Sequence, residues 1–414
     1  MSSSTISLKP IRDVSEQMLK KIPEALKGME FQRAVGTEID RIDNDYFNQL
    51  QSTMHTFLLH MQQNEASDID LGGAGTAGRI WYRVHGNKKP LQTSLALEPI
   101  ETDILLHSII STDQREELLN KRSIDFSYSL EHNGTSYRYR ANMYFDLEHL
   151  ALNMRKIDAE IRPFKSLNLH TEVAKALSLK YYKYGLTLVT GITGSGKSST
   201  LDTIIDANNR TVDAHIVVIA SPVELIHQPI RSVVRHREVG RDVGSFKEGA
   251  IQALRQDPDI IVIGELRDPE TIMTALEITD SGHKTFGTLH TSSAMESIER
   301  ILGEVPTEDI NRTRSRLADV LTCVVSQKLV PSMDGKRVLA KEILLGTPSV
   351  RAAIRNNNIN EIYQMLAEGG EMGMITMEQD LKRLYDSRVI SKEEAYNNAN
   401  NKKRLSQLLD ELDY

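Results

Sequence analysis

The sequence contains a single cysteine, Cys323, in the apolar run Val-Leu-Thr-Cys-Val-Val. One cysteine excludes a disulfide within the chain and any zinc site built from several cysteines. We expect its thiol to be buried and unreactive, in a protein that works in a reducing compartment. Aromatic residues are also scarce, at 5% with one tryptophan, so the cores of this 414-residue chain must be mainly aliphatic.

Long apolar runs and an excess of basic charge are absent as well. No segment approaches the roughly 18 apolar residues that a membrane-spanning helix needs, so we expect no membrane insertion. The first ten residues lack the basic and then apolar layout of a secretory signal peptide, which favours a cytoplasmic protein. The net charge of −7 gives no support for a broad nucleic-acid-binding surface, and we expect no direct contact with nucleic acid.

The most informative segment is a glycine-rich loop between a predicted strand and a predicted helix. A short apolar run is followed by Gly191, four further residues, Gly196, Lys197 and Ser198. This spacing is typical of a P-loop, in which backbone N–H groups surround a β-phosphate, the lysine reaches the β- and γ-phosphate oxygens and the hydroxyl ligates Mg²⁺. The N-terminus of the following helix adds partial positive charge. We therefore predict that ATP and Mg²⁺ are held by Gly191, Thr193, Gly194, Ser195, Gly196, Lys197, Ser198 and Ser199.

Three polar residues follow other predicted strands and are candidates for catalysis. Glu265 ends the run Asp-Ile-Ile-Val-Ile-Gly-Glu, where Gly264 replaces the usual aspartate, and it would contact Mg²⁺ through a bound water molecule. Glu224 is a candidate general base, although an acid after a proline turn is common in loops. His290 is the third, although a lone histidine is more often structural than catalytic. Parallel strands deliver residues at their carboxyl ends to one crevice, so we expect all three near the P-loop.

The pattern of apolar residues divides the chain into five parts. Residues 1–45 form a polar extension with some helix, across 15–28. Residues 46–157 form a smaller α+β domain, and residues 158–170 are the predicted linker and hinge because they mix charge with a proline. Residues 349–414 are mostly helical. A core over 171–348 is predicted between the linker and this helical part. Its predicted strands at 186–190, 215–219, 259–263 and 284–288 alternate with predicted helices at 197–207, 245–255 and 269–280. This alternation is typical of a parallel sheet with crossover helices.

Four motifs, in order, resemble those of the secretion and pilus motor ATPase family. They are the P-loop, Pro222-Val-Glu224-Leu-Ile-His-Gln as the Asp box, Gly264-Glu265-Leu-Arg-Asp as the Walker B motif and Gly287-Thr-Leu-His290-Thr as the His box. Weaker similarity lies outside this region, where Arg138-Tyr-Arg140-Ala-Asn resembles the family's N-terminal domain and Gly373-Met-Ile-Thr-Met the C-terminal segment of its retraction branch. The resemblance implies an α/β fold with a RecA-like P-loop NTPase core, a PAS-like α+β N-terminal domain and a helical C-terminal segment.

The resemblance also implies a mechanochemical ATPase that assembles as a ring of six identical subunits. In such a ring the core of one chain holds the nucleotide and the N-terminal domain of a neighbour closes the site with arginines. Arg138, Arg140 and Arg155 are the candidates, although by themselves they are more often solvated surface charge. An arginine against the γ-phosphate stabilises charge in the transition state. Hydrolysis would power pilus retraction through a platform protein of the inner membrane, at which the ring docks peripherally, and a paralogous motor ATPase is a further candidate partner.

Some residues depart from the family's pattern. Ala220-Ser221 stands where Glu-Asp is usual, which removes two carboxylates near Glu224. Asp70 replaces a frequent histidine, and Asp146-Leu147 stands where an arginine is common. These changes are compatible with slow hydrolysis, but the retained P-loop and strand-end acids argue against an inactive enzyme.

Two other functions stay open at this point. The same ATPase can serve pilus assembly or a type II or type IV secretion system, which the sequence barely distinguishes from retraction. The other is a weakly active, nucleotide-binding regulatory subunit of a motor ring, favoured by the loss of carboxylates at Ala220 and Ser221.

Overall fold

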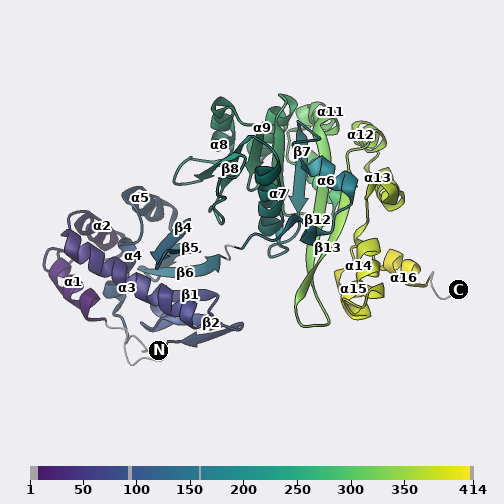
Figure 1. Cartoon of the computed structure of the whole chain (residues 1–414). Helices are drawn as coiled ribbons and strands as arrows, with labels where there is room; N and C mark the ends of the chain where they lie inside the picture. Colours follow the sequence, from purple (N-terminus) through teal and green to yellow (C-terminus); the bar gives the residue numbers. More distant parts are fainter. Residues whose placement is uncertain (1–7, 92–95, 158–159, 411–414) are drawn as a thin grey trace. The chain divides into compact units, whose positions relative to one another are not determined.

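The computed structural model describes residues 8–91, 96–157 and 160–410 (Figure 1). The chain forms two compact units, residues 1–159 and 160–414, each with its own apolar core. Cys323 is buried in the second core, and this burial raises the pKa of its thiol to about 12, as expected for an unreactive cysteine. Among the described residues, no helix combines the length and the apolar character that crossing a membrane requires.

The first unit is an antiparallel sheet covered by helices, in the strand order β3-β2-β1-β6-β5-β4. Its strands are β1 (Asp68–Gly72), β2 (Trp81–Val84), β3 (Asn87–Pro90), β4 (Ser123–His132), β5 (Thr135–Asp146) and β6 (His149–Ile157). Its helices are α1 (Lys9–Leu19), α2 (Gly28–Ile39), α3 (Asn44–Gln63), α4 (Pro99–His107) and α5 (Thr112–Lys121), with a short 3-10 turn, η1 (Ala74–Thr76). The unit therefore has the α+β composition that the sequence predicts.

Strand residues of this sheet alternate between the helices and the opposite, polar face. On β5, Tyr139, Ala141 and Met143 are buried in the core, whereas Arg140 and Asn142 between them point the other way. A sheet with one covered face and one polar face is the usual arrangement for antiparallel strands. The polar face carries the arginines that the sequence singles out.

The N-terminal residues differ from the prediction in one respect. The helix expected across 15–28 is wrong, because α1 ends at Leu19 and α2 begins at Gly28. Both helices bury apolar side chains in the core of the first unit, among them Ile11, Val14, Val35 and Ile39. The many charged residues between these positions gave the segment its polar character, but their spacing leaves one apolar stripe on each helix.

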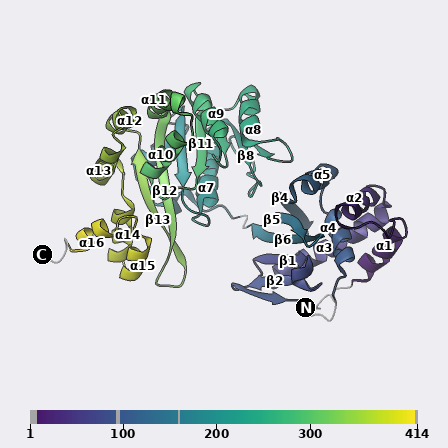
Figure 2. The ribbon, with the colours of Figure 1, turned by 180° about the vertical axis from the view of Figure 1, so that it is seen from behind.

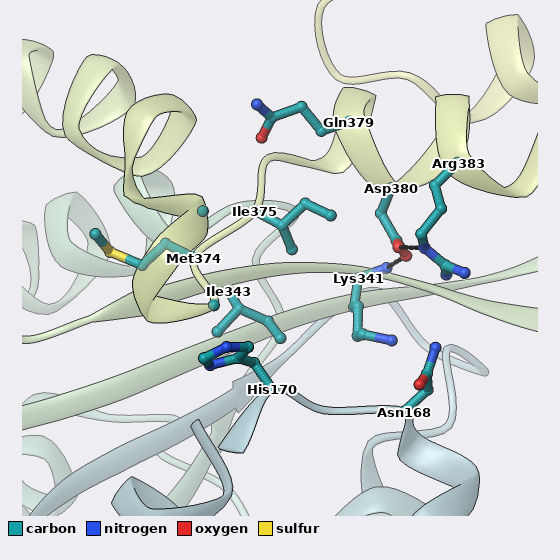
Figure 3. Close-up of a pocket in the computed structure, with 11 residues that line it drawn as sticks. Asn168, His170, Lys341, Ile343, Met374, Ile375, Gln379, Asp380 and Arg383 are labelled. Carbon is teal, nitrogen blue, oxygen red and sulfur yellow. Dashed lines mark hydrogen bonds and ion pairs between the residues drawn. The ribbon is translucent and has the colours of Figure 1, made fainter. Parts of the chain in front are cut away.

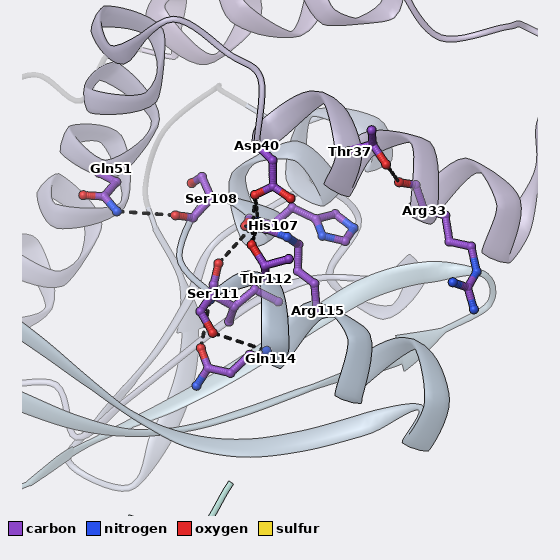
Figure 4. A network of polar contacts seen from close by, with 11 residues as sticks. Arg33, Thr37, Asp40, Gln51, His107, Ser108, Ser111, Thr112, Gln114 and Arg115 are labelled. Carbon is purple, nitrogen blue, oxygen red and sulfur yellow. Dashed lines mark hydrogen bonds and ion pairs between the residues drawn. The ribbon is translucent and has the colours of Figure 1, made fainter. Parts of the chain in front are cut away.

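A buried arginine joins α2 to the turn between α4 and α5 (Figure 4). Arg115 is 6% exposed and donates hydrogen bonds to the carbonyl oxygens of His107 and Ile110, each over 2.9 Å. Its guanidinium also pairs with Asp40 at the end of α2. Ser111 and Gln114 form a capping box that fixes the start of α5. The N-terminal helices are thereby tied to the rest of the unit by polar contacts as well as by packing.

The second unit contains a seven-stranded sheet in the order β13-β12-β7-β11-β10-β8-β9. Its strands are β7 (Gly185–Thr190), β8 (His215–Ala220), β9 (Val233–Glu238), β10 (Ile260–Ile263), β11 (Lys284–Leu289), β12 (Leu321–Pro331) and β13 (Arg337–Leu345). The strands from β12 to β9 are parallel and only β13 is antiparallel. The RecA-like core predicted from the sequence is confirmed, while β9 and the β12–β13 hairpin are additions that the sequence analysis missed.

Helices cover both faces of this sheet (Figures 1 and 2). They are α6 (Thr171–Leu177), α7 (Lys197–Thr211), α8 (Phe246–Ala253), α9 (Pro269–Asp280), α10 (Ala294–Gly303) and α11 (Ile310–Val320), with the 3-10 turns η3 (Leu254–Gln256) and η4 (Thr307–Asp309). The crossovers β7–α7–β8 and β10–α9–β11 run in opposite directions along the sheet. Since right-handed crossovers are the rule, α7 lies on one face and α9 on the other. The carboxyl ends of β7, β8, β10 and β11 meet at one edge, which is where ligands bind in such sheets.

The C-terminal segment is helical, as predicted, and packs in two places. It comprises α12 (Pro348–Arg355), α13 (Ile359–Glu368), η5 (Gly369–Met372), α14 (Met377–Asp386), α15 (Lys392–Asn398) and α16 (Lys402–Asp410). The first two helices join the main core, and the last three pack around the far end of the β12–β13 hairpin, near Val330 and Ala340. The helix α15 is capped at Ser391, whose side chain accepts a hydrogen bond from the N–H of Glu394.

The predicted linker over 158–170 falls partly outside the described residues, because these omit 158 and 159. The remainder contains the 3-10 turn η2 (Phe164–Leu167), and Leu167 is buried in the core of the second unit. The division between the two units lies between residues 159 and 160. The stretch from Phe164 onward is therefore part of the second unit.

Candidate nucleotide site

The P-loop leaves β7 at Thr190 and ends at the first turn of α7. Gly191, Gly194 and Gly196 have φ angles of +151°, +81° and +88°, in the region that favours glycine. A Cβ atom at Gly191 would collide with the side chain of Ser195 and with the backbone of Gln327. The loop needs glycine at these positions because of backbone conformation and close packing, which agrees with its sequence pattern. Its position suits a phosphate, because the N-terminus of a 15-residue helix follows the loop directly.

Lys197 folds back on the P-loop. Its Nζ atom donates to the carbonyl oxygens of Gly191 over 2.8 Å and of Ile192 over 3.2 Å. Burial lowers the pKa of this lysine, and the charge of Glu265 opposes that shift. The ammonium group is thus held among the loop's own oxygens, in the position from which a P-loop lysine reaches phosphate oxygens. Of the other predicted ligands, Thr193, Ser198 and Ser199 are exposed on the loop and the first turn of α7.

Gln327 on β12 contacts the P-loop through a hydrogen bond. The sequence analysis missed this residue. Its Nε2 atom donates to the carbonyl oxygen of Ser195 over 2.8 Å, and the residue is 1% exposed. The Oε1 atom of Gln327 and the hydroxyl of Ser195 are buried without a hydrogen-bond partner among the described residues. No motif marks this glutamine, and only the pairing of Ser326 with Thr190 places it beside the loop.

Glu265 lies between two cationic or polar partners at the end of β10. Its carboxylate contacts His290 Nε2 over 3.2 Å and Arg267 Nε over 2.7 Å. The sheet therefore brings together the ends of β10 and β11, as the sequence predicts for Glu265 and His290. Gly264 is explained by packing, since a Cβ atom there would lie 3.0 Å from the carbonyl oxygen of Ile219. An aspartate in that position would require the neighbouring strand to move.

His290 is neutral around pH 7 for two reasons. Burial lowers its pKa first, and the nearby charge of Lys197 lowers it further, while Glu265 acts in the opposite direction. Because Nε2 faces a carboxylate, this nitrogen carries the proton and donates to Glu265. The histidine therefore orients the carboxylate and leaves its negative charge available near Lys197.

The loop after β8 carries Glu224, which is half-buried. The loop is anchored on β9, because the backbone N–H of Val223 donates to the buried carboxylate of Glu238 over 2.9 Å. Glu238 is also the register partner of Ala220, one of the two positions that lack a carboxylate. The Ser221–Pro222 peptide bond is cis. Glu224 thus follows a parallel strand at the same edge as the P-loop, while its role stays a prediction.

A second anchor joins this loop to the helix that follows the P-loop. His227 is 2% exposed, and its Nε2 atom lies 3.1 Å from a carboxylate oxygen of Asp202 on α7. Its ring stacks on that of His236, with centroids 5.7 Å apart and planes at 4°. His227 belongs to the Asp-box motif. In the structure its side chain is buried and holds the loop in position, rather than lying exposed.

The three candidate arginines lie together in the first unit, on the polar face of its sheet. Arg140 and Arg155 are register partners on β5 and β6, and Arg138 is two residues from Arg140 on the same face. Arg155 Nε donates to Asp68 over 2.8 Å, yet its side chain is 67% exposed. Arg138 donates to the hydroxyl of Ser129 over 3.0 Å. The P-loop, Glu265 and His290 belong to the other unit, so the predicted residues form two separate clusters within one chain.

The cluster that contains the P-loop, Glu265 and His290 fits a nucleotide with Mg²⁺. The P-loop supplies backbone N–H groups and a lysine, the hydroxyl of Ser198 stands at the first turn of α7, and Glu265 is an anchored carboxylate. Oxygen donors of this kind are those that Mg²⁺ prefers. Within the described ranges, no group of three or more histidine, cysteine or acidic side chains forms a metal site by itself.

Comparisons with known proteins cover most of the chain. The profile of a family described as "Type II/IV secretion system protein" matches residues 43–409. The type IV pilus retraction ATPase PilT of Pseudomonas aeruginosa is 38% identical over 330 residues, which are 80% of this chain and 93% of that protein. A twitching motility protein of Neisseria gonorrhoeae is 36% identical over 325 residues, 78% of this chain and 85% of that protein.

Solved structures resemble the chain over a similar length. The crystal structure of the pilus retraction motor PilT with bound ADP has a TM-score of 0.76 at 36% identity, and the match covers 85% of this chain and 98% of that one. The ATPase DotB of Legionella pneumophila has a TM-score of 0.74 at 28% identity, covering 83% and 94% of the two chains.

Proposed function

We infer that this chain, which belongs to the family of type II/IV secretion system proteins, is a motor ATPase that powers retraction of a type IV pilus. The observation that carries this inference is the cluster of the P-loop, Glu265 and His290 at one edge of the sheet. It stands in a chain that is 38% identical to a retraction ATPase, in a match that covers 93% of that ATPase. The reaction is hydrolysis of ATP to ADP and phosphate.

We assign the chemistry of hydrolysis to side chains of the second unit. Lys197 is held beside Glu265 and places positive charge where the β- and γ-phosphates would lie. Glu265, oriented by His290 and Arg267, accepts a hydrogen bond from a water molecule in the site. Glu224 is the proposed general base that takes the proton of the attacking water. Mg²⁺, when bound by Ser198 and through water by Glu265, would neutralise charge on the phosphates.

A ring of six subunits would complete this site with arginines from a neighbour. Arg138, Arg140 and Arg155 share one face of a sheet in a different unit from the P-loop, and Arg140 and Arg155 are exposed, which supports a role toward another surface. An arginine that stabilises the γ-phosphate in the transition state makes hydrolysis depend on closure of the two units. Closure then converts binding of ATP into movement.

Mixing two inactive variants tests whether the site is shared between subunits. Lys197→Ala removes the P-loop lysine, and Arg140→Ala combined with Arg155→Ala removes the arginines. If a subunit's arginines serve its neighbour, mixed rings contain some sites that are intact on both sides, and ATPase activity returns on mixing. Arg33→Ala, an exposed arginine on α2, is the matched control and is expected to keep full activity. No recovery on mixing would mean that arginines and P-loop of one site belong to the same chain.

Retraction itself is tested in cells. We propose that the ring docks from the cytoplasm on a platform protein of the inner membrane, with a paralogous motor ATPase as a further partner. Cells without the gene are expected to carry excess pili and to lose twitching, and a copy with Lys197→Ala is expected not to restore it. Fewer pili than in the parent strain would instead indicate pilus assembly.

A secretion ATPase is the second candidate function. It is favoured by the family profile that matches residues 43–409, which is described as "Type II/IV secretion system protein". Loss of secretion with normal twitching in the same deletion strain would select it. A weakly active regulatory subunit, favoured by Ala220-Ser221, would show almost no turnover alone and would copurify with a more active motor.

A further inference from the structure

A pocket of about 380 Å³ lies within the second unit, where the C-terminal helices meet the core (Figure 3). It is lined from three directions by Asn168 and His170, by Lys341 and Ile343 of β13, and by residues of the η5–α14 segment. No residue of the P-loop, and none of Glu224, Glu265 and His290, lines it. The pocket is therefore a separate feature from the nucleotide site.

Donor groups gather at one end of this pocket. Lys341 is 6% exposed, and its Nζ atom makes one hydrogen bond, to the carbonyl oxygen of Leu167 over 3.0 Å. An ammonium group has three protons to donate, so most of its capacity is left for another partner. Figure 3 shows the side chain of Asn168 turned toward this ammonium group and the guanidinium of Arg383 on the same side. Among the described residues, the guanidinium of Arg383 donates only from its Nε atom, to Asp380.

Two side chains that line the pocket, Asp380 and Gln379, already accept hydrogen bonds within the protein. Asp380 is fully buried, and its two oxygens accept hydrogen bonds from the backbone N–H of Lys341 over 2.9 Å and from Arg383 Nε over 2.7 Å. The side-chain oxygen of Gln379 accepts from the N–H of Thr376 over 2.9 Å. Lys341 and Arg383 thus place two cationic groups beside the single carboxylate of Asp380, each of whose oxygens already accepts one hydrogen bond. A cationic end of this kind, buried at Lys341 and exposed at Arg383, favours an anionic ligand.

The other end of the pocket is apolar. Ile343, Met374 and Ile375 line it beside the ring of His170 (Figure 3). The Nδ1 atom of His170 accepts a hydrogen bond from the N–H of Glu172 over 3.3 Å, so in the neutral ring Nε2 carries the proton. A ligand with a charged head and an apolar or aromatic body matches both ends.

We propose that this pocket binds a small oxyanion, a phosphate or a carboxylate, attached to an apolar or aromatic group. The oxyanion lies against Lys341, Arg383 and Asn168, and the apolar group lies on Ile343 and Met374. Such a ligand joins residues 168–170, which follow the boundary of the two units, to α14 and would stabilise the C-terminal helices on the core. This inference does not depend on which machine the ATPase serves.

Calorimetric titration of the full-length protein, saturated with ADP and Mg²⁺ so that the P-loop is filled, tests the proposal. The probes are inorganic phosphate, phenyl phosphate and benzoate, with neutral benzyl alcohol as the uncharged comparison. Phenyl phosphate or benzoate is expected to bind at least tenfold more tightly than benzyl alcohol, and the tighter of the two identifies the head group. Phenyl phosphate is expected to exceed inorganic phosphate because only the former uses the apolar end.

Variants decide whether binding occurs in this pocket. Arg383→Gln is expected to weaken binding about tenfold, the loss of one charge-assisted hydrogen bond. Lys382→Gln, on the same helix but outside the pocket, is the matched control and is expected to bind as the wild type does. If Arg383→Gln fails to fold, Asn168→Ala, at an exposed position, replaces it. No binding of any oxyanion, or equal binding by Arg383→Gln and the wild type, would overturn the proposal.

Discussion

The side-chain amide of Gln327 donates a hydrogen bond over 2.8 Å to the carbonyl oxygen of Ser195, and so connects the strand next to β7 with the middle of the P-loop. The bond is buried, and Gly196 leaves room for it, since a Cβ atom there would lie 3.3 Å from the same amide nitrogen. The conformation of the P-loop therefore depends on a residue 132 positions along the chain.

Replacement of Gln327 by leucine is expected to raise the KM for ATP about tenfold, with a smaller change in kcat. The substitution removes the donor and leaves the Ser195 carbonyl buried without its partner. This loss destabilises the ordered conformation of the loop by about 1–2 kcal/mol. Steady-state ATPase kinetics measure both constants. Gln364→Leu, at an exposed position of α13, is the control, and an unchanged KM in Gln327→Leu would show that the loop holds its shape without this bond.

His290 is expected to act through its hydrogen bond to Glu265. His290→Ala frees one side of the carboxylate and should lower kcat by about 10- to 100-fold, the usual range for a residue that orients a group at a metal site. His290→Gln retains an N–H donor and should recover part of that loss. Because the pKa of His290 is lowered, any step in the activity that its protonation causes should lie at a lower pH than for an exposed histidine. Equal rates for the alanine and glutamine variants would contradict the orienting role.

Restoring the family's usual residues with Ala220→Glu and Ser221→Asp is expected to lower stability without accelerating hydrolysis. A glutamate at position 220 would stand beside its register partner Glu238, which is buried and already bonded to Val223. Like charges directly opposite each other on neighbouring strands repel, and position 220 is half-buried beside the buried Glu238. Thermal unfolding and ATP turnover of the double variant provide the readout. A rise in turnover above tenfold would instead support the regulatory-subunit alternative.

Glu342 gives the second unit a pH-dependent stability. Burial at the starts of α10 and α14 raises the pKa of Glu342 to about 7, against 4.5 for an unperturbed glutamate. Between these values the folded state binds a proton that the unfolded state has released, so the free energy of unfolding falls as the pH rises from 4.5 to 7. The shift corresponds to a fall on the order of 3 kcal/mol.

The Glu342→Gln variant should lack this fall. Urea unfolding of the wild type and the variant at several pH values would therefore give stability curves with different slopes between pH 4.5 and 7. Glu361→Gln, at an exposed position on α13, serves as the matched control and should follow the wild type. Parallel curves for the wild type and Glu342→Gln would contradict the assignment.

The sequence predicted the nucleotide core well because its signals are local. The P-loop and the apolar runs before Glu265 and His290 each lie within one strand and the residues after it, and the structure has those strands at nearly the expected bounds. The parallel order of the strands then places these residues at one edge by topology alone. Glycine positions such as Gly191 and Gly196 are also readable, since their φ angles admit few other residues.

What the sequence did not reveal depends on distant pairings. Gln327 follows an apolar run that could be a strand anywhere in a sheet, and only the pairing of β12 with β7 places it under the P-loop. The helices α1 and α2 carry too many charges to be recognised as core elements from composition. Arg138, Arg140 and Arg155 were found through resemblance, and their shared face follows from the register of β5 and β6.

The most direct test of the account is the rate of phosphate release from ATP and Mg²⁺ by the purified wild type, Lys197→Ala and Glu265→Gln, each checked for folding by thermal denaturation. We expect steady turnover by the wild type and a loss of about 100- to 1,000-fold in each variant, because each removes a charge that acts at the phosphates or the attacking water. Equal rates in all three proteins would contradict the assignment of this cluster as the site of ATP hydrolysis.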